Sequence, residues 1–293
     1  MDIALMVHAG AGAYPPPYMG PAQKGCREGI LAGWHILQNN GSALDAVEAA
    51  VRVLEDNPLY NAGTGSSLTS EGKIEMDAGI MDGATFQVGA VAGVELIKNP
   101  IKLARKVLES PHVMLIGQGA QQFAREQGMP FCRREDLLTE HVYQRWQGYR
   151  ANPMPSKEWK HGTVGAVAVD SAGRLAAATS TGGTMNKHPG RVGDSPLIGC
   201  GYYADEYAAV SCTGYGEDFV RLLIARRAAE YVAQGYTAQH AADKAMDMLA
   251  TLTSGTGALI IVDAQGRAAF AKVSEHMPYA SISGNMTEPQ TGI

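Results

Sequence analysis

A Gly-Thr pair ahead of an apolar run is the part of this sequence best suited to do chemistry. Gly162 and Thr163 stand directly before the run 164–170, which reads Val-Gly-Ala-Val-Ala-Val-Asp. If the peptide bond before Thr163 were cut, this residue would carry both a hydroxyl and a free α-amine. An α-amine with a pKa of about 7.7 to 8.0 can accept the hydroxyl proton, so an N-terminal threonine supplies nucleophile and base together. Without other evidence, the pair is more typical of an ordinary turn before a buried strand.

The loop 180–195 contains a second set of reactive groups, because hydroxyl, cationic and anionic side chains lie close together in it. Arg191 and Asp194 are separated by Val192 and Gly193. A guanidinium binds a carboxylate through two hydrogen bonds, and a carboxylate binds an ammonium group, so the two residues could hold the head group of an amino acid. The alternative is a surface loop in which Arg191 and Asp194 pair with each other.

Two more glycine-containing loops could contribute backbone groups. The segment 211–217 joins an apolar run to a predicted helix, where backbone amides and the Thr213 hydroxyl could donate to an oxyanion. The segment 57–66 could surround a cation with carbonyl oxygens. Each has a simpler interpretation, an ordinary strand-to-helix turn for the first and the end of a helix for the second.

Predicted strands and helices must position these loops. Apolar side chains recur with helical spacing in six segments, 23–38, 42–56, 101–109, 118–127, 217–234 and 238–252. The clearest of them begins with a capping box of Ser42 and Asp45. Strands are expected at 3–8, 113–116, 164–170, 175–179, 208–213, 258–263 and 268–273, with extended chain in 74–93. Turns containing Asp and Gly predict two antiparallel hairpins, and strands that are apolar throughout predict sheets covered on both faces.

The segment 133–162 differs from the rest of the chain. Arginine, lysine and proline accumulate there while apolar periodicity fades. We therefore expect a flexible linker that ends directly before Thr163. An exposed linker is a place where a chain can be cut without losing its fold.

Composition predicts one domain and excludes several classes of function. The 293 residues are 45% hydrophobic and carry a net charge of −5, so a nucleic-acid-binding surface is not expected. The apolar opening, residues 1–7, is too short for a signal peptide, so none is expected. The sequence has no apolar run of the roughly 18 residues that a membrane helix needs, and no CxxC spacing among its four cysteines. Pro15 stands where a dinucleotide-binding loop has its third glycine, and the eight histidines lack zinc-hydrolase spacing. We expect a cytoplasmic protein with a small-molecule substrate and no membrane partner.

Taken together, the motifs resemble those of the plant-type asparaginase/isoaspartyl peptidase family of N-terminal-nucleophile (Ntn) hydrolases. The matching segments follow one another in the same order along nearly the whole chain: 57–65, 81–83, 89–94, 111–114, 162–167, 180–183, 186–187, 189–196 and 212–217. The resemblance implies a single α/β (α+β) domain, 1–293, folded as a four-layer αββα sandwich. It further implies autocatalytic cleavage between Gly162 and Thr163 into an α subunit, 1–162, and a β subunit, 163–293, with two cleaved αβ units forming an α2β2 homodimer.

The same resemblance implies a role for particular residues. Thr163 would be the nucleophile, Thr181 would tune its hydroxyl, and Asn61 would lie near it. Thr213 and Gly214 would form the oxyanion hole and, with Gly216, Arg191 and Asp194, would bind the substrate. The family needs no cofactor for catalysis but carries a structural sodium ion, held mostly by backbone carbonyls; the matching residues are Leu54, Glu55, Asn57, Tyr60, Ala62 and Thr64.

The implied reaction is hydrolysis of L-asparagine and isoaspartyl (β-aspartyl) dipeptides to L-aspartate through a threonine acyl-enzyme. One alternative is a glycosylasparaginase-type amidohydrolase, although such enzymes usually have Asp where this chain has Gly162. Another is an uncleaved, non-catalytic binder of the same fold. Two residues depart from the family pattern. Ala9 replaces a glycine of a loop linked to precursor strain, which predicts an altered cleavage rate, and Tyr215 predicts a narrower pocket or stacking on a leaving group.

Overall fold

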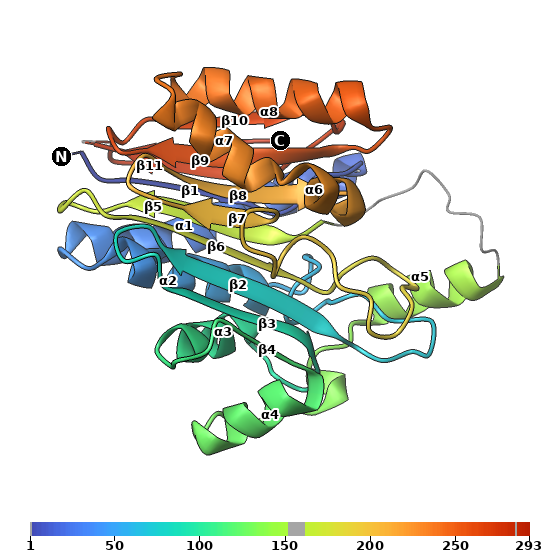
Figure 1. Cartoon of the computed structure of the whole chain (residues 1–293). Helices are drawn as coiled ribbons and strands as arrows, with labels where there is room; N and C mark the ends of the chain where they lie inside the picture. The colour runs from blue at the N-terminus through green and yellow to red at the C-terminus, as the bar shows by residue number, and fades with distance from the viewer. Residues whose placement is uncertain (1, 152–161, 285) are drawn as a thin grey trace.

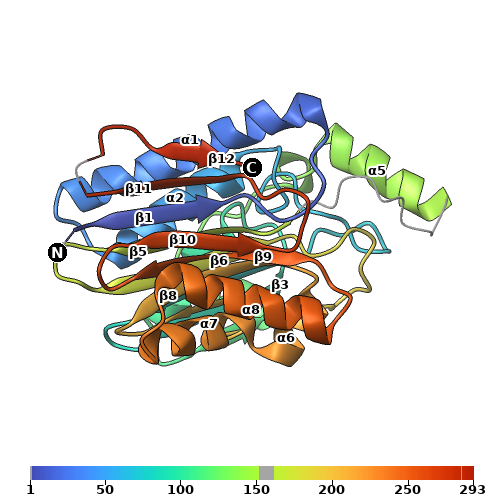
Figure 2. The ribbon, with the colours of Figure 1, turned by 90° about the horizontal axis from the view of Figure 1, so that it is seen from above.

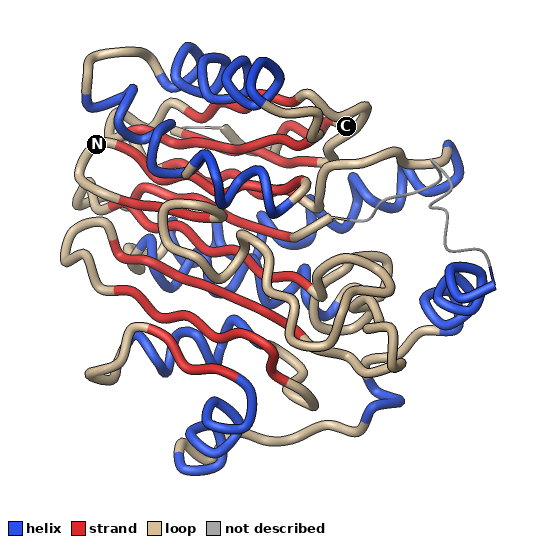
Figure 3. The backbone as a smooth tube through the Cα atoms, turned by 45° about the vertical axis from the view of Figure 1, so that its right-hand side comes forward, coloured by secondary structure: helices blue, strands red, loops and turns tan. Residues whose placement is uncertain are grey.

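Two β-sheets stacked face to face form the centre of the molecule, with helices on both outer faces (Figure 1). The computed structural model describes residues 2–151, 162–284 and 286–293. Figure 2 and Figure 3 show the same stacking from two further directions, with the helices outside the strands. The expected four-layer αββα sandwich is confirmed.

The larger sheet has eight strands within the described residues, in the order β12-β11-β1-β5-β6-β2-β3-β4. Its strands are β1 (Ala4–His8), β2 (Met76–Asp82), β3 (Val88–Val94), β4 (Met114–Ile116), β5 (Val164–Val169), β6 (Leu175–Thr181), β11 (Tyr279–Ser283) and β12 (Gln290–Gly292). Neighbouring strands are antiparallel except β3 and β4. The sequence analysis missed β11 and β12.

The smaller sheet has the order β10-β9-β8-β7 and is antiparallel throughout its described residues. Its strands are β7 (Tyr202–Ala204), which was not predicted, β8 (Ala208–Gly214), β9 (Gly257–Asp263) and β10 (Ala268–Lys272). Both predicted hairpins, β5–β6 and β9–β10, are confirmed. Asp170 and Asp263 stabilise the two turns in the same way, because each carboxylate accepts backbone N–H bonds from residues two and four positions later.

Helices cover the outer face of each sheet (Figure 1). Helices α1 (Pro16–Gln38), α2 (Ala43–Asp56) and α3 (Pro100–Leu108) pack on the larger sheet, and α7 (Ile224–Ala233) and α8 (Ala238–Leu252) pack on the smaller one. Ser42 caps α2 as predicted, since its hydroxyl accepts from the Asp45 amide. Helix α4 (Gly117–Glu126) follows β4. No helix among the described residues is long and apolar enough to cross a membrane.

Two helical regions differ from the predictions. The helix expected over 217–234 is divided into α6 (Gly216–Leu222) and α7, because Leu223 adopts a left-handed φ of 52° that ends the first helix. The expected linker 133–162 contains the short 3-10 helix η1 (Arg134–Asp136) and helix α5 (Glu140–Ala151). Trp146 anchors α5 by donating from its indole nitrogen to the Thr69 carbonyl at 2.8 Å. The linker prediction is therefore wrong for this part, and 152–161 lie outside the described residues.

Candidate active site

The Gly-Thr pair and the two other threonines singled out in the sequence lie at the same end of the stacked sheets. Val164 is opposite Ser180 in the antiparallel β5–β6 pair, so Thr163, just before β5, is beside Thr181, the last residue of β6. Strand β8 brings Thr213 to the same end from the facing sheet. The sheets approach closely here because Gly165 has no side chain; a Cβ at this position would clash with the hydroxyl of Ser211 on β8.

A small pocket gathers the residues that the sequence predicted for the site. Its lining residues are Asn61, Gly162, Thr163, Thr181, Gly183, Thr184, Arg191, Gly193, Asp194, Ser195, Gly214 and Gly216. Of the residues assigned to catalysis, substrate binding or cleavage, Thr213 alone is not part of this lining; it is fully buried next to Gly214. The free space is about 30 Å³. Four loops that are far apart in the sequence therefore meet at Thr163.

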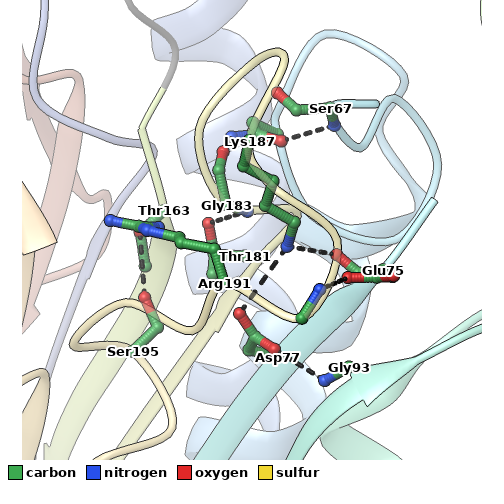
Figure 4. Close-up of polar contacts among 12 residues, drawn as sticks. Ser67, Glu75, Asp77, Gly93, Thr163, Thr181, Gly183, Lys187, Arg191 and Ser195 are labelled. Carbon is green, nitrogen blue, oxygen red and sulfur yellow. Dashed lines mark hydrogen bonds and ion pairs between the residues drawn. The ribbon is translucent and has the colours of Figure 1, made fainter. Parts of the chain in front are cut away.

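The Thr163 hydroxyl is buried and has a hydroxyl partner. Its Oγ1 lies 3.1 Å from the Oγ of Ser195, and the two side chains point toward each other in Figure 4. Ser195 belongs to the loop noted in the sequence analysis but was assigned no role there. A hydroxyl can donate one hydrogen bond and accept others, so Ser195 can orient the Thr163 oxygen.

Gly162 lies where the backbone of the N-terminal segment comes very close. A Cβ on Gly162 would lie 2.6 Å from the Thr213 hydroxyl oxygen and 2.7 Å from both the Ala11 nitrogen and the Gly10 Cα. Gly10 has a φ of 103°, which favours glycine, whereas Ala9 has no positive φ and is buried. Alanine therefore fits position 9 without backbone strain.

Strand β8 is tied to the same N-terminal segment. The Ala11 amide donates to Thr213 Oγ1 at 3.0 Å, and His8 Nε2 lies 3.0 Å from Ser211 Oγ. Burial lowers the pKa of His8 to about 3, so its imidazole is neutral. The sequence analysis did not single out His8. The Thr213 hydroxyl keeps its own proton available to donate into the site.

Asn61 fixes the chain that follows β6. Its side-chain amide donates to the Gly183 carbonyl at 2.6 Å, and its side-chain oxygen accepts from the Ser67 amide at 2.8 Å. The Gly183 amide in turn donates to Thr181 Oγ1 at 3.0 Å. Asn61 lines the same pocket as Thr163, and its side-chain amide holds the chain that follows Thr181.

Arg191 has a partner that the sequence did not suggest. Its Nε and Nη2 donate to the two carboxylate oxygens of Glu217 at 3.0 and 2.8 Å. The Arg191–Asp194 pair considered in the sequence analysis is not among the ion pairs of the described residues, since the guanidinium pairs with Glu217 instead. Gly193 and Gly216 leave room for the guanidinium, since a Cβ on either would lie 2.8 to 3.0 Å from its terminal nitrogens. The third guanidinium nitrogen, Nη1, does not donate to Glu217.

Asp194 is a buried carboxylate, and no cation of the described residues forms a direct ion pair with it. The residue is 3% exposed, and Oδ2 has no hydrogen-bond partner within the described part of the chain. Burial raises the pKa of Asp194 to about 7, while the charge of Arg191 opposes this rise. A buried, unsatisfied carboxylate oxygen is costly unless a ligand satisfies it. The position suits an ammonium group. Tyr215, next to the pocket-lining Gly214 and Gly216, is half exposed.

The loop expected to hold sodium directs carbonyl oxygens toward its glycines. A Cβ on Gly63 would lie 2.5 Å from the Glu55 carbonyl oxygen, and one on Gly65 would lie 2.6 Å from those of Pro58 and Tyr60. Neutral carbonyl oxygens are ligands for hard cations. Pro58 was not among the predicted ligands. Within the described residues, no group of three His, Cys, Asp or Glu side chains is placed to hold a metal ion.

Comparison with known proteins gives one consistent set of matches. A family model described as Asparaginase matches residues 1–293. The chain is 46% identical to the plant-type L-asparaginase of Pyrococcus abyssi over 99% of this chain and 100% of that protein. It is 47% identical to the plant-type L-asparaginase of Thermococcus kodakarensis, over 99% of both chains. It is 43% identical to the isoaspartyl peptidase/L-asparaginase of Danio rerio, over 94% of this chain and 91% of that protein.

Proposed function

The chain belongs to the asparaginase family, and we propose that it cuts itself before Thr163 and then hydrolyses the side-chain amides of L-asparagine and β-aspartyl dipeptides to L-aspartate. The observation that carries this proposal is the pocket in which Thr163, Arg191 and Asp194 meet. A nucleophile beside a cation and an anion suits a substrate with a carboxylate, an ammonium group and a reactive carbonyl. L-asparagine and β-aspartyl dipeptides have an α-carboxylate, an α-ammonium group and a side-chain amide carbonyl. The names of the relatives support the same substrates.

Self-cleavage is the first reaction in this proposal. The Thr163 hydroxyl attacks the Gly162 carbonyl carbon, the bond from that carbon to the Thr163 nitrogen breaks, and an ester replaces the amide. Water then hydrolyses the ester, which leaves a carboxylate on Gly162 and a free α-amine on Thr163. The close packing of Gly162 against Gly10 and Thr213 supports this step, because tight packing can hold a backbone in a strained geometry.

Cleavage is also needed to make room for a substrate. The pocket has about 30 Å³ of free space, compared with roughly 300 to 1,000 Å³ in typical ligand pockets. Gly162 forms part of its wall. Withdrawal of the new C-terminus at Gly162 would enlarge the pocket next to Thr163, so cleavage would create the nucleophile and open its site in one event.

We propose that Arg191 and Asp194 bind the head group of the substrate. Glu217 holds the guanidinium through Nε and Nη2, which leaves Nη1 for the substrate carboxylate. The unsatisfied Oδ2 of Asp194 accepts from the substrate ammonium group. With both charged groups fixed, the side-chain carbonyl is the remaining reactive group and is directed to Thr163.

Acyl transfer then proceeds in two halves. The α-amine of Thr163 takes the hydroxyl proton, Oγ1 attacks the side-chain carbonyl carbon, and the Thr213 hydroxyl and Gly214 amide donate to the oxyanion. The leaving nitrogen receives the proton and departs as ammonia or as an amino acid. Water attacks the acyl-enzyme and releases aspartate. Ser195 and Thr181 would orient the nucleophile, and every group in these steps comes from the chain itself, so the proposal includes no catalytic cofactor.

A structural sodium ion belongs to the proposal as a support for Asn61. The carbonyl oxygens of Pro58 and Tyr60 both approach the Cβ position of Gly65, which suits such an ion. The Glu55 carbonyl approaches Gly63 instead and accepts from the Thr64 amide. The other predicted ligands lie at the end of α2 or in the loop that follows it. When bound, the ion would tie the end of α2 to the residues that precede Asn61.

We also propose an α2β2 homodimer in the cytoplasm. Val113 and Ile116, at the edge strand β4, are 58% and 64% exposed and provide apolar surface for a second copy. Cys26, Cys132, Cys200 and Cys212 are free, which suits a reducing compartment.

A comparison of substrates tests the proposed activity. Cleaved protein should release aspartate from L-asparagine and from β-Asp-Leu, and should leave glycosylasparagine intact. A preference for glycosylasparagine would instead favour the glycosylasparaginase-type alternative. Fully cleaved protein that hydrolyses none of the three would refute the proposed activity. The Thr163→Ala variant is the matched control and should be inactive on all of them.

A further inference from the structure

A buried ammonium group lies beneath the loop that carries the head-group residues. The Lys187 side chain is 1% exposed, which is rare for lysine unless it is paired. Its Nζ donates to the Glu75 carbonyl oxygen at 2.7 Å and lies 4.0 Å from Asp77 Oδ2 (Figure 4). The sequence analysis named Lys187 only as part of a motif, and the proposed reaction does not use it.

Asp77 is an equally buried partner on β2. Its Oδ1 accepts from the Gly93 amide at 2.8 Å, and its Oδ2 has no hydrogen bond within the described residues. Burial lowers the pKa of Lys187 and raises the pKa of Asp77, while each charge opposes the shift of the other. Loss of one member would leave the other charge buried and uncompensated, which is strongly destabilising.

The Lys187 ammonium packs directly on Gly183. Gly183 has a φ of 74°, and a Cβ on it would lie 2.7 Å from Lys187 Nζ. The Gly183 amide donates to the Thr181 hydroxyl oxygen, and its carbonyl accepts from Asn61. A shift of the ammonium would therefore displace the residue that fixes Thr181 beside Thr163.

Glu75 anchors the same loop at a second point. Its carboxylate accepts from the Gly190 amide at 2.8 Å, and Arg191 follows directly. The carbonyl of Glu75 thus binds Lys187, whereas its side chain binds the backbone next to Arg191. A substitution of the Glu75 side chain can remove one anchor and leave the other in place.

We propose that Lys187 is a positioning residue, whose ammonium, held between Asp77 and the Glu75 carbonyl, fixes Gly183 and through it Thr181 beside the nucleophile. The Glu75 carboxylate has the corresponding role for Arg191. This inference rests on the proposed function, because Thr181 acts there on the nucleophile and Arg191 on the substrate carboxylate. We therefore expect loss of the Lys187 ammonium to change kcat and loss of the Glu75 carboxylate to change KM.

Kinetics of cleaved protein, normalised to the amount of free Thr163 N-terminus, test this division. Lys187→Met should lower kcat by about a hundredfold and change KM by less than about twofold, because a displacement of roughly 1 Å near the reacting atoms has that effect. Glu75→Ala should mainly raise KM. Lys73→Met removes an exposed lysine and should leave both constants unchanged. Equal kcat in Lys187→Met and wild type would overturn the proposal.

The double variant Lys187→Met/Asp77→Asn separates positioning from simple charge compensation, and it also serves if the single variant does not fold. It buries no uncompensated charge but still lacks the ammonium, so kcat should stay low. Restoration of wild-type kcat would mean that Lys187 only neutralises Asp77.

Hydrogen exchange gives a readout that does not depend on substrate. In the double variant, exchange should become faster in 181–191 and stay unchanged in β9. Unchanged exchange in 181–191 would contradict the anchoring role whatever the activity. If the wild-type protein hydrolyses none of the substrates, the proposed function is refuted. Faster exchange in 181–191 of the double variant would then still support the role of Lys187 in holding this loop.

Discussion

Gly10 and Gly162 face each other so closely that a Cβ on Gly10 would lie 2.6 Å from the Gly162 Cα. Gly10 also has a φ of 103°, a backbone conformation that other residues rarely adopt. Two glycines from opposite ends of the segment 1–162 therefore meet at the bond that we propose is cut, and neither has a side chain to keep the backbones apart.

This relationship predicts different outcomes for two neighbouring substitutions. Gly10→Ala should slow self-cleavage by at least about tenfold, because the added methyl group must push Gly162 away from the attacking hydroxyl. Ala9→Gly should change the rate by less than about threefold, since Ala9 has no positive φ to relieve. The fraction of cut chain on denaturing gels over time measures both. Equal rates in Gly10→Ala and wild type would show that the close approach does not affect cleavage.

Arg191→Ala should separate hydrolysis from self-cleavage. The guanidinium lines the substrate pocket but makes its hydrogen bonds to Glu217 rather than to the cleavage site. Loss of charge-assisted hydrogen bonds to a carboxylate, at about 1.5 to 3 kcal/mol each, should lower kcat/KM for β-Asp-Leu by about a hundredfold or more. Self-cleavage should proceed nearly as in wild type. Near wild-type kcat/KM in this variant would contradict the head-group role.

The pH dependence of substrate binding should report the ionisation of Asp194. Its carboxyl must be ionised to bind an ammonium group, and its pKa is raised to about 7 by burial. The value of kcat/KM should therefore fall as the pH drops through about 7, with most of the change in KM, because bound substrate favours the ionised form. Asp194→Asn should have low kcat/KM and lack this change in KM. An identical pH dependence of KM in both proteins would assign the ionisation to another group.

Glu55 should make the folded chain less stable at alkaline pH. Burial raises the pKa of its carboxyl to about 8 from an ordinary value of 4.5, although Ser180 and the Ile101 amide donate to it. The folded state therefore retains a proton that the unfolded state loses, and the free energy of unfolding falls as the pH rises from about 4.5 to 8. Glutamine keeps the accepting oxygen and carries no charge, so Glu55→Gln should reduce this fall.

Urea unfolding measures this effect in a Thr163→Ala background, which keeps the protein as one chain. At pH 9, Glu55→Gln should be more stable than its parent by on the order of a few kcal/mol, and at pH 4.5 the two should be similar. Lower stability of Glu55→Gln at pH 9 would contradict the raised pKa.

The parts of the site that lie at strand ends could be predicted from the sequence. The short turn at Asp170 sets the register of β5 and β6, which puts Thr163 beside Thr181. The apolar run of strand β8 was recognised in the sequence, and Thr213 lies near the end of this strand. Local patterns locate Thr163 and Thr213 because each is positioned by its own strand, whereas the role of Thr181 came from the family resemblance.

Contacts between loops could not be predicted in this way. Glu217 lies 26 residues from Arg191, and its pairing depends on where α6 begins relative to the loop 180–195. Ser195 and Lys187 find their partners on other elements for the same reason. Helix α5 was missed because few of its side chains, Val142 and Trp146, are buried, which gives weak periodicity.

Mass spectrometry of the purified protein tests the central claim most directly. Incubated protein should give two chains, one ending at Gly162 and one beginning at Thr163, and the appearance of the second should parallel the appearance of asparaginase activity. Thr163→Ala should remain a single, inactive chain. Hydrolysis of L-asparagine by protein whose chain stays uncut, or is cut at another bond, would contradict the assignment of Thr163 as an N-terminal nucleophile.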